Sequence, residues 1–390
     1  MRLSEKIRRL PGSAVREVFD RANAMEQSGT NVIHLEIGRP WFDTPTVVKD
    51  AAKVALDLGR VHYSPSRGII ELRAAIAGKL ERENRILADP ETEIIVTSGN
   101  KQATFLAMNA LLNEGDEVVL TDPCYGPHYK EALFVGAVPR LLDLHPEENW
   151  TIDAKSLRSV VGAQTKAIVI NTPHNPTGRV FTCRELQAIA DCAVENDLIV
   201  ITDETYEYFS YDDAQHVSIG SLEQLSGRTV STFAFTKSYA MDGWRLGYAV
   251  APATVITGMT KLVQLDTAGP NTFAQYGAIE AAKLGASGAA EMVEEDRKAR
   301  DLASSRLAEM GIPCPHVEGA IYAFPAIGNL ELSDEEFVVR LLEECGVALT
   351  PGSAFGKQGK LRVRIAFGAV PIDILDEALD RIEGFVDALG

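Results

Sequence analysis

The sequence contains no uninterrupted run of about 18 apolar residues, the length that a membrane-spanning helix requires. We therefore expect no membrane-spanning helix and no membrane partner. The segment from Met1 to Lys6 is charged, and no short apolar stretch of the kind found in secretory signals follows it. Internal repeats and low-complexity linkers are also absent from the sequence, which argues against a repeat architecture.

Cysteine is scarce and shows no paired spacing. The chain has 5 cysteines among 390 residues, and none falls in a Cys-x-x-Cys pattern. An odd number without such spacing does not suit a disulfide framework or a zinc site. The sequence therefore predicts reduced thiols, a cytoplasmic location and no bound metal.

Positive charge is also in short supply. Lys and Arg number 38 against 55 Asp and Glu, which gives a formal net charge of −17. Proteins that bind nucleic acid present a basic surface to the phosphate backbone, so we expect no nucleic-acid partner. Net charge does not limit the choice of a small substrate, because a site can be locally positive on an acidic protein.

What the chain does contain is an alternation of short, apolar, β-prone runs with helical segments. The expected strands are Thr92–Thr97, Glu117–Thr121, Ala167–Asn171, Ile199–Thr202, Thr229–Thr236 and Leu246–Ala251. The expected helices are Lys101–Asn113, Arg184–Glu195, Thr254–Leu265 and roughly Gly288–Met310. This order predicts an α/β fold in which a mostly parallel sheet lies between helices. Ligands of such sheets bind beyond the carboxyl ends of the strands.

The most informative segment runs from Thr236 to Tyr248 and places Lys237 directly after an apolar strand. A bare cation there is costly to bury, whereas an amine that forms a Schiff base with an aldehyde cofactor is not. Arg245, eight residues later, suits a fixed anion such as the phosphate of that cofactor. For an isolated Lys/Arg pair, a solvated surface loop is the commoner arrangement. Residues elsewhere in the chain have to distinguish between a cofactor site and a surface loop.

A phosphate site is predicted where Gly99, Asn100 and Lys101 link a strand to a helix. Glycine permits close backbone approach, and the free N–H groups of the first helical turn favour an anion. Taken alone, the segment also fits a plain strand-to-helix turn.

Polar residues follow two further strands. Asp203 ends a strand that is too apolar to be exposed. At such a place its carboxylate could pair with the protonated ring nitrogen of a ligand, or it could cap a helix. Tyr206, three residues later, lies close enough to contact a hydroxyl group on the same ring. Asn175, in a turn-rich segment, suits a ring oxygen or a carboxylate, although the segment alone would be a loop. Tyr125 fits equally well as a stacking partner for a flat ring and as an aromatic at the core edge. His174 receives no role.

Together these residues resemble the class I/II aminotransferases, which are fold-type I pyridoxal-phosphate enzymes of the aspartate aminotransferase superfamily. The match runs in order over nearly the whole chain, from Gly38-Arg39-Pro40 to Arg364. The combination of Asn175-Pro176-Thr177-Gly178, Asp203-Glu204-x-Tyr206 and Lys237-x7-Arg245 is highly specific. The resemblance implies a large domain (residues 46–282) with a mostly parallel seven-stranded sheet. It also implies a smaller α+β domain built from residues 1–45 and 283–390.

The resemblance further implies a role for each residue toward pyridoxal 5'-phosphate. Lys237 forms the Schiff base and carries the proton, Asp203 pairs with the ring nitrogen, and Asn175 and Tyr206 hold the ring oxygen. Tyr125 stacks on the ring, and the phosphate is held by Gly99, Asn100, Lys101 and Arg245. Arg364 binds the substrate α-carboxylate with Gly38 and Asn175. Tyr63 reaches the phosphate of a neighbouring subunit, which implies a homodimer with shared active sites.

The sequence departs from the family pattern at a few positions. Ala234 stands where many members have a serine that contributes to phosphate binding. Arg39 and Trp41 change charge and bulk close to the expected place of a substrate side chain. Arg362 and Arg364 are expected on one face of a strand, because side chains alternate along it.

The predicted activity is transfer of an amino group between an L-amino acid and a 2-oxo acid by a ping-pong mechanism. The same residues also suit a β-eliminating carbon–sulfur lyase or another pyridoxal-phosphate enzyme that forms a carbanion. An alternative of a different class is a catalytically silent regulatory protein that binds the cofactor.

Overall fold

The computed structural model describes residues 2–389. Its centre is a seven-stranded sheet in the order β2-β8-β7-β6-β5-β3-β4, in which only β8 runs antiparallel to its neighbours. The strands are β2 (Ile94–Thr97), β3 (Glu117–Asp122), β4 (Val138–Asp143), β5 (Thr165–Asn171), β6 (Ile199–Asp203), β7 (Thr229–Ala234) and β8 (Gly247–Val250). The predicted α/β class with a mostly parallel sheet is therefore confirmed.

Helices cover both faces of this sheet. They are α3 (Thr46–Asp57), α4 (Ile70–Lys79), α5 (Asn100–Leu111), α6 (Gly126–Val135), α7 (Ala154–Val160), α8 (Cys183–Glu195), α9 (Ala253–Asp266) and α10 (Thr272–Leu284). Neighbouring strand residues point to opposite faces. Ile168 packs with α8 residues such as Ile189, whereas Val169 packs with α5 residues such as Leu106. The central strands are therefore buried on both sides, which explains their continuous apolar runs.

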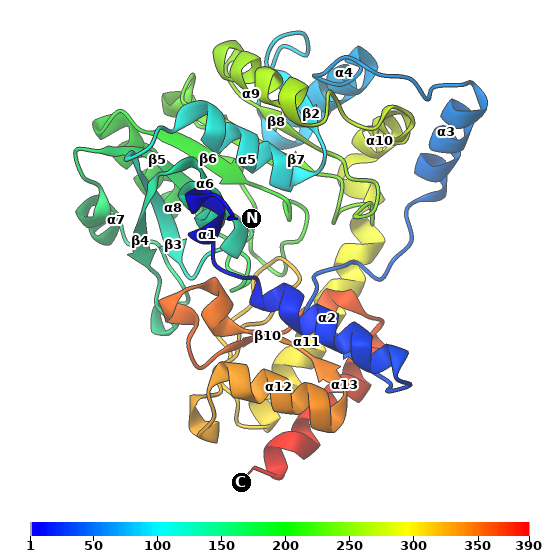
Figure 1. Cartoon of the computed structure of the whole chain (residues 1–390), viewed down its shortest axis with the longest axis vertical. Helices are drawn as coiled ribbons and strands as arrows, with labels where there is room; N and C mark the ends of the chain where they lie inside the picture. Colours follow the sequence, from blue (N-terminus) through cyan, green and yellow to red (C-terminus); the bar gives the residue numbers. More distant parts are fainter. Residues whose placement is uncertain (1, 390) are drawn as a thin grey trace.

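Most of the remaining elements lie in the lower half of the molecule in Figure 1, whereas the short N-terminal helix lies higher, beside α6. These remaining elements are α1 (Glu5–Arg8), α2 (Ala14–Gln27), β1 (Ile33–His34), α11 (Ala290–Glu309), α12 (Asp334–Cys345), β9 (Val347–Ala348), β10 (Thr350–Pro351), β11 (Val363–Arg364) and α13 (Ile372–Asp387). β1 pairs in parallel with β9, and Val18 of α2 shares a hydrophobic cluster with Leu341 of α12 and Leu379 of α13. The N-terminal segment therefore packs on the C-terminal elements. The domain bounds at residues 46 and 282 stay a prediction.

Six of the seven sheet strands lie where the sequence predicts them, with ends that differ by at most two residues. The sequence prediction missed β4, which lies at the edge of the sheet and contains Pro139. Its side chains are mostly exposed or half-buried, because an edge strand has a partner on one side only. β4 consequently lacks the apolar run that marks the inner strands.

Among residues 2–389, no helix combines the length and the apolar character needed to cross a membrane.

Candidate active site

A cavity of about 1000 Å³ lies at the carboxyl ends of the central strands and is closed on the other side by N-terminal and C-terminal segments. Ten of the twelve predicted site residues line it: Gly38, Asn100, Lys101, Tyr125, Asn175, Asp203, Tyr206, Lys237, Arg245 and Arg364. Gly99 immediately precedes the lining residue Asn100, whereas Tyr63 lies outside the cavity and is 94% exposed. The structure thus brings residues from distant parts of the sequence to one place.

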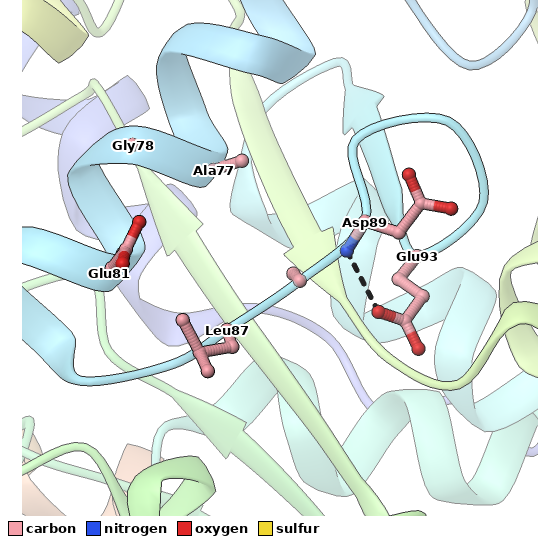
Figure 2. A pocket seen from close by; sticks show the side chains of 7 residues that line it. Ala77, Gly78, Glu81, Leu87, Asp89 and Glu93 are labelled. Atoms are coloured by element: carbon pink, nitrogen blue, oxygen red, sulfur yellow. Dashed lines mark hydrogen bonds between the residues drawn. The ribbon is translucent and has the colours of Figure 1, made fainter.

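A second, smaller pocket of about 320 Å³ lies between α4 and the segment that leads into β2, and Figure 2 shows its lining. Its polar side chains are acidic: Glu81, Asp89 and Glu93. Glu93 accepts a hydrogen bond from the backbone N–H of Asp89 at 2.9 Å. Because none of its lining residues is a cation or a nucleophile, this pocket does not suit the anionic ligand that the sequence predicts.

Lys237 lies in the loop after β7 and points its amine toward the N-terminal wall of the cavity, where Nζ donates a hydrogen bond to the carbonyl of Gly38. Burial lowers the pKa of the Lys237 ammonium to about 8. The carboxylate of Asp242 opposes this shift, and the positive charge of Arg364 adds to it. The neutral amine, which is the nucleophilic and basic form, is therefore far more accessible than in an ordinary lysine.

Arg245 and the amino end of α5 form one wall of the cavity. Arg245 has a left-handed backbone (φ +56°), and its guanidinium donates to the carbonyls of Asp242 at 2.9 Å and Ser98 at 3.3 Å. Gly99 caps the helix with φ +83°, and a Cβ atom there would lie 2.6 Å from Nη2 of Arg245. Only glycine at this position leaves room for the guanidinium beside the free N–H groups of the helix. Such a pairing has the charge and the hydrogen-bond donors that suit a phosphate-sized anion.

Asp203 ends β6 and is buried, with 4% of its surface exposed. Its Oδ1 accepts a hydrogen bond from the backbone N–H of Thr205 at 3.0 Å, and its Oδ2 lies 3.2 Å from Nε2 of His128. The half-buried ring of Tyr125 stands edge-on to the His128 ring, with 5.2 Å between the ring centres. A buried carboxylate thus faces the middle of the cavity.

Arg364 is buried and all of its hydrogen bonds go to neutral oxygen atoms. Nη1 donates to Oδ1 of Asn175 at 3.1 Å, Nη2 donates to the carbonyl of Glu36 and to Oγ1 of Thr350, and Nε has no hydrogen-bond partner. Asn175 is held in turn, because its backbone N–H donates to Oδ1 of Asn171 at 2.7 Å. A buried guanidinium without a carboxylate partner requires an anion for full compensation.

Two tyrosines that are distant in sequence meet in the cavity. The hydroxyl of Tyr206 lies 2.6 Å from the hydroxyl of Tyr322. A Cβ atom on Gly38 would lie 1.9 Å from the Tyr322 hydroxyl oxygen, so glycine is required there. Burial raises the pKa of Tyr206 well above its usual range, so its hydroxyl keeps its proton. Tyr206 is therefore available as a hydrogen-bond donor.

The family model described as aminotransferase class I and II matches residues 30–382. The chain is 42% identical to an aspartate aminotransferase of Pyrococcus abyssi, with 98% of each chain covered. It is 40% identical to an aromatic-amino-acid aminotransferase of Thermococcus litoralis, again with 98% of each covered. The chain belongs to the class I and II aminotransferases.

Solved structures agree with this assignment. The crystal structure of Pyrococcus protein-A1 is 41% identical in sequence and superposes with a TM-score of 0.95, with 99% of each chain covered. The aspartate aminotransferase of Thermus thermophilus with maleate is 36% identical, with a TM-score of 0.93, and the match covers 98% of this chain and 100% of that one. The fold and the enzyme class predicted from the sequence are therefore confirmed, and the chain is an aminotransferase.

The cavity of this aminotransferase is far more basic than the chain as a whole. Nine cations line it: Arg16, Arg39, Lys101, Lys130, Lys237, Arg245, Lys357, Lys360 and Arg364. Only four carboxylates do: Asp122, Asp203, Asp242 and Glu335. On a chain with net charge −17, this excess concentrates anions at the cavity.

Sequence reasoning missed two polar residues of the aminotransferase site. His128 lies on α6, and its contact with Asp203 joins positions 75 residues apart, so no local pattern marks it. Tyr322 follows α11 in a segment without regular strand spacing. A polar side chain at the end of an apolar strand can be recognised from the sequence. The positions of His128 and Tyr322 near the site depend on how helices and loops pack, which the sequence pattern does not show.

Three further residues that the sequence places near the site differ in their relation to the cavity. Arg362 is not among the residues that line it. The Arg362 guanidinium instead lies over the ring of Trp150, 4.9 Å from its centre. Arg39 lines the cavity as expected. Trp41 lies outside it and packs against Phe42, with 4.1 Å between the ring centres.

His174, to which the sequence assigned no role, is a buried structural residue. Its ring nitrogens lie 3.2 Å from the hydroxyl of Thr121 and 2.7 Å from that of Thr177. Burial lowers the His174 pKa to about 3, so the ring is neutral.

Proposed function

We propose that this aminotransferase uses pyridoxal 5'-phosphate to move an amino group between an L-amino acid and a 2-oxo acid in two half-reactions. The observation that carries the proposal is the joint placement of Lys237, Asp203 and Arg245 around one cavity, each with a different kind of chemistry. When bound, pyridoxal phosphate supplies a carbonyl that accepts the amino group and a ring that delocalises negative charge from the substrate Cα.

The residues present fit this cofactor. The pairing of Arg245 with the amino end of α5 suits the phosphate, because both present hydrogen-bond donors to an anion. We propose that Gly99, Asn100, Lys101 and Arg245 hold the phosphate. Ala234, which stands where a serine was expected from the family pattern, lines the same cavity and offers no hydroxyl. Arg245 therefore carries more of this contact.

The ring of the cofactor would lie between Tyr125 and the end of β6. We propose that Asp203 holds a proton on the ring nitrogen, because a buried carboxylate stabilises a cation beside it. Tyr206 and Asn175 would hold the ring oxygen as hydrogen-bond donors, and Tyr125 would cover one face of the ring.

The substrate would be held by its α-carboxylate. Arg364 presents a planar fork that matches a carboxylate, with Asn175 bonded at one side. We propose that the backbone of Gly38, which also lines the cavity, assists it. Lys237 would act as the group that takes up and gives back the proton at the substrate Cα. The depressed pKa of its ammonium suits an amine that alternates between base and acid near neutral pH.

We also propose a homodimer with shared active sites. The segment around Tyr63 carries side chains that are unusually exposed for apolar residues: Val54 (55%), Leu58 (69%), Val61 (57%) and Tyr63 (94%). It comprises the end of α3 and the loop that follows this helix, at the outer edge of the molecule in Figure 1. Burial of this surface against a second copy would remove apolar area from water and bring Tyr63 toward the partner's phosphate site.

The requirement for a 2-oxo acid tests the reaction. A transaminase stops after one amino group per site unless a 2-oxo acid is present, because the amino group has to leave to a second substrate. Repeated turnover of an amino acid without a 2-oxo acid would instead indicate β-elimination. No turnover under either condition, with the cofactor bound, would indicate a silent binding protein.

A further inference from the structure

Three titratable side chains form a buried cluster beside the cavity: Glu131, His128 and Asp203. Their exposed fractions are 8%, 2% and 4%. Glu131 and His128 are three residues apart on α6 and therefore share one face of the helix. Asp203 lines the cavity, whereas His128 and Glu131 lie behind its lining and have no place in the mechanism above.

Glu131 is not explained by the needs of the fold. Its Oε2 atom is buried without a hydrogen-bond partner. The hydroxyl of neighbouring Thr104 is within hydrogen-bond reach of the Glu131 carboxyl group and also donates to backbone carbonyls of α5. An unsatisfied buried carboxylate is destabilising, and an apolar side chain of similar size would avoid that loss. A residue retained in such a place calls for another role.

The contact between His128 and Asp203 depends on charge. Nε2 of His128 lies 3.2 Å from Oδ2 of Asp203 but is not aligned for a hydrogen bond to it. Attraction at this distance without alignment is strong only when the imidazole is protonated and the carboxylate ionised. The protonation state of His128 therefore decides how firmly the pair is held.

The groups around Glu131 come from three elements. Lys101 and Thr104 face it from α5, His128 from its own helix, and Asp203 from β6. Burial raises the Glu131 pKa to about 7, and the positive charge of His128 opposes this rise. Burial also lowers the His128 pKa, but Asp203 and then Glu131 raise it, and the net shift is upward. The negative charge of Glu131 therefore favours the protonated form of His128.

We propose that Glu131 is a positioning residue: its carboxylate favours the protonated imidazole of His128 and so strengthens the contact of His128 with Asp203, the residue that we assign to the cofactor's ring nitrogen. The effect of Glu131 on His128 is argued from the buried cluster and does not depend on the cofactor. The effect on the cofactor's ring nitrogen rests on the proposed function. The cluster carries one more negative charge when Glu131 ionises, so the site around Asp203 changes its charge near neutral pH.

Titration of His128 in the full-length protein tests this inference directly. The chain has 7 histidines, and their ring signals are resolved by NMR with labelled histidine, with His128→Gln identifying the relevant signal. In Glu131→Gln and Glu131→Met, the titration midpoint of His128 should fall by at least about one pH unit, because a nearby opposite charge is lost. Glu131→Asp keeps the negative charge, so its His128 titration midpoint should stay close to that of the unaltered protein.

Asp296→Asn is the matched control. Asp296 is another buried carboxyl with an unpartnered oxygen, but it lies on α11, outside the cluster. Its replacement should leave the His128 midpoint unchanged. If all Glu131 variants titrate like the unaltered protein while only their thermal stability changes, Glu131 is a structural residue and the inference is wrong.

The second readout is the absorbance of pyridoxal phosphate bound to the same variants. Its pH midpoint should move in Glu131→Gln and Glu131→Met but not in Asp296→Asn. An unmoved midpoint would break the link to the ring nitrogen. If the unaltered protein takes up no cofactor at Lys237, the proposed function fails, and the NMR titration still decides whether Glu131 controls His128.

Discussion

The guanidinium of Arg364 donates from Nη1 to Oδ1 of Asn175 at 3.1 Å, which joins β11 in the C-terminal part of the chain to the loop after β5. Both residues were predicted for the substrate carboxylate, and the structure holds them in direct contact. The other hydrogen bonds of Arg364 also go to neutral oxygens, so no carboxylate among its hydrogen-bond partners balances its positive charge. This charge is available to an anionic ligand. The proposed mode of substrate binding depends on this arrangement.

Arg364→Lys should raise the KM for the amino acid roughly 10- to 100-fold, with a smaller change in kcat. Loss of one charge-assisted hydrogen bond is worth about 1.5–3 kcal/mol, and lysine cannot form the two-point contact. Steady-state kinetics measures the effect. Arg362→Lys is the control, since Arg362 packs on Trp150 outside the cavity. If the KM rises in Arg362→Lys and stays unchanged in Arg364→Lys, the substrate carboxylate binds at Arg362 and the assignment to Arg364 is wrong.

Gly99→Ala should weaken pyridoxal phosphate binding at least about tenfold, because the new methyl group displaces the Arg245 guanidinium that we assign to the phosphate. Titration of the cofactor-free protein, followed by absorbance, gives the dissociation constant. Gly115→Ala separates this effect from backbone strain. Gly115 has a similar φ of +88°, but nothing lies within 4 Å of the added Cβ. Equal cofactor affinity in both variants would argue against the phosphate site.

The sequence predicted the fold and most of the site for one physical reason. Inner strands buried on both faces are continuous apolar runs, so a polar residue at their ends, such as Asp203 or Lys237, stands out. The edge strand β4 lacks this contrast and was missed. His128 and Glu131 lie on a helix whose local pattern gives no sign of the strand it faces. That Arg362 packs on Trp150 and does not line the cavity follows from tertiary packing, which the sequence pattern does not show.

Lys237→Met should stabilise the cofactor-free protein at about pH 7 by on the order of 1–3 kcal/mol. The ammonium has a pKa of about 8 when folded, below the ordinary value of 10.5 that applies when unfolded. Folding therefore carries a penalty below about pH 8, which fades as the pH rises toward 10.5. The advantage of the variant should fade over the same window.

Urea unfolding at several pH values measures this difference. Lys166→Met is the control, because Lys166 is exposed on β5 and the replacement should give no comparable gain. If the free energy of unfolding of Lys237→Met exceeds that of the unaltered protein by the same amount at every pH, the gain comes from packing and the electrostatic explanation is wrong.

Tyr63→Ala should lower cofactor affinity roughly 10- to 100-fold although Tyr63 lies outside the cavity of its own chain. Mixing it with Lys237→Ala under conditions of subunit exchange should restore tight binding and activity in a fraction of sites. Such hybrids contain one site with an intact Lys237 and an intact partner Tyr63. Leu87→Ala, at another exposed apolar residue (79%), should leave affinity unchanged. Mixing without any recovery would contradict shared active sites.

Transfer of isotopically labelled nitrogen is the sharpest test of the proposed amino-group transfer. The protein loaded with pyridoxal phosphate is incubated with a nitrogen-labelled L-amino acid and an unlabelled 2-oxo acid, and the products are analysed by mass spectrometry. We expect the label to appear in the amino acid derived from the 2-oxo acid, and Lys237→Ala to abolish this transfer. Release of the label as free ammonia, with none in the new amino acid, would contradict the proposal.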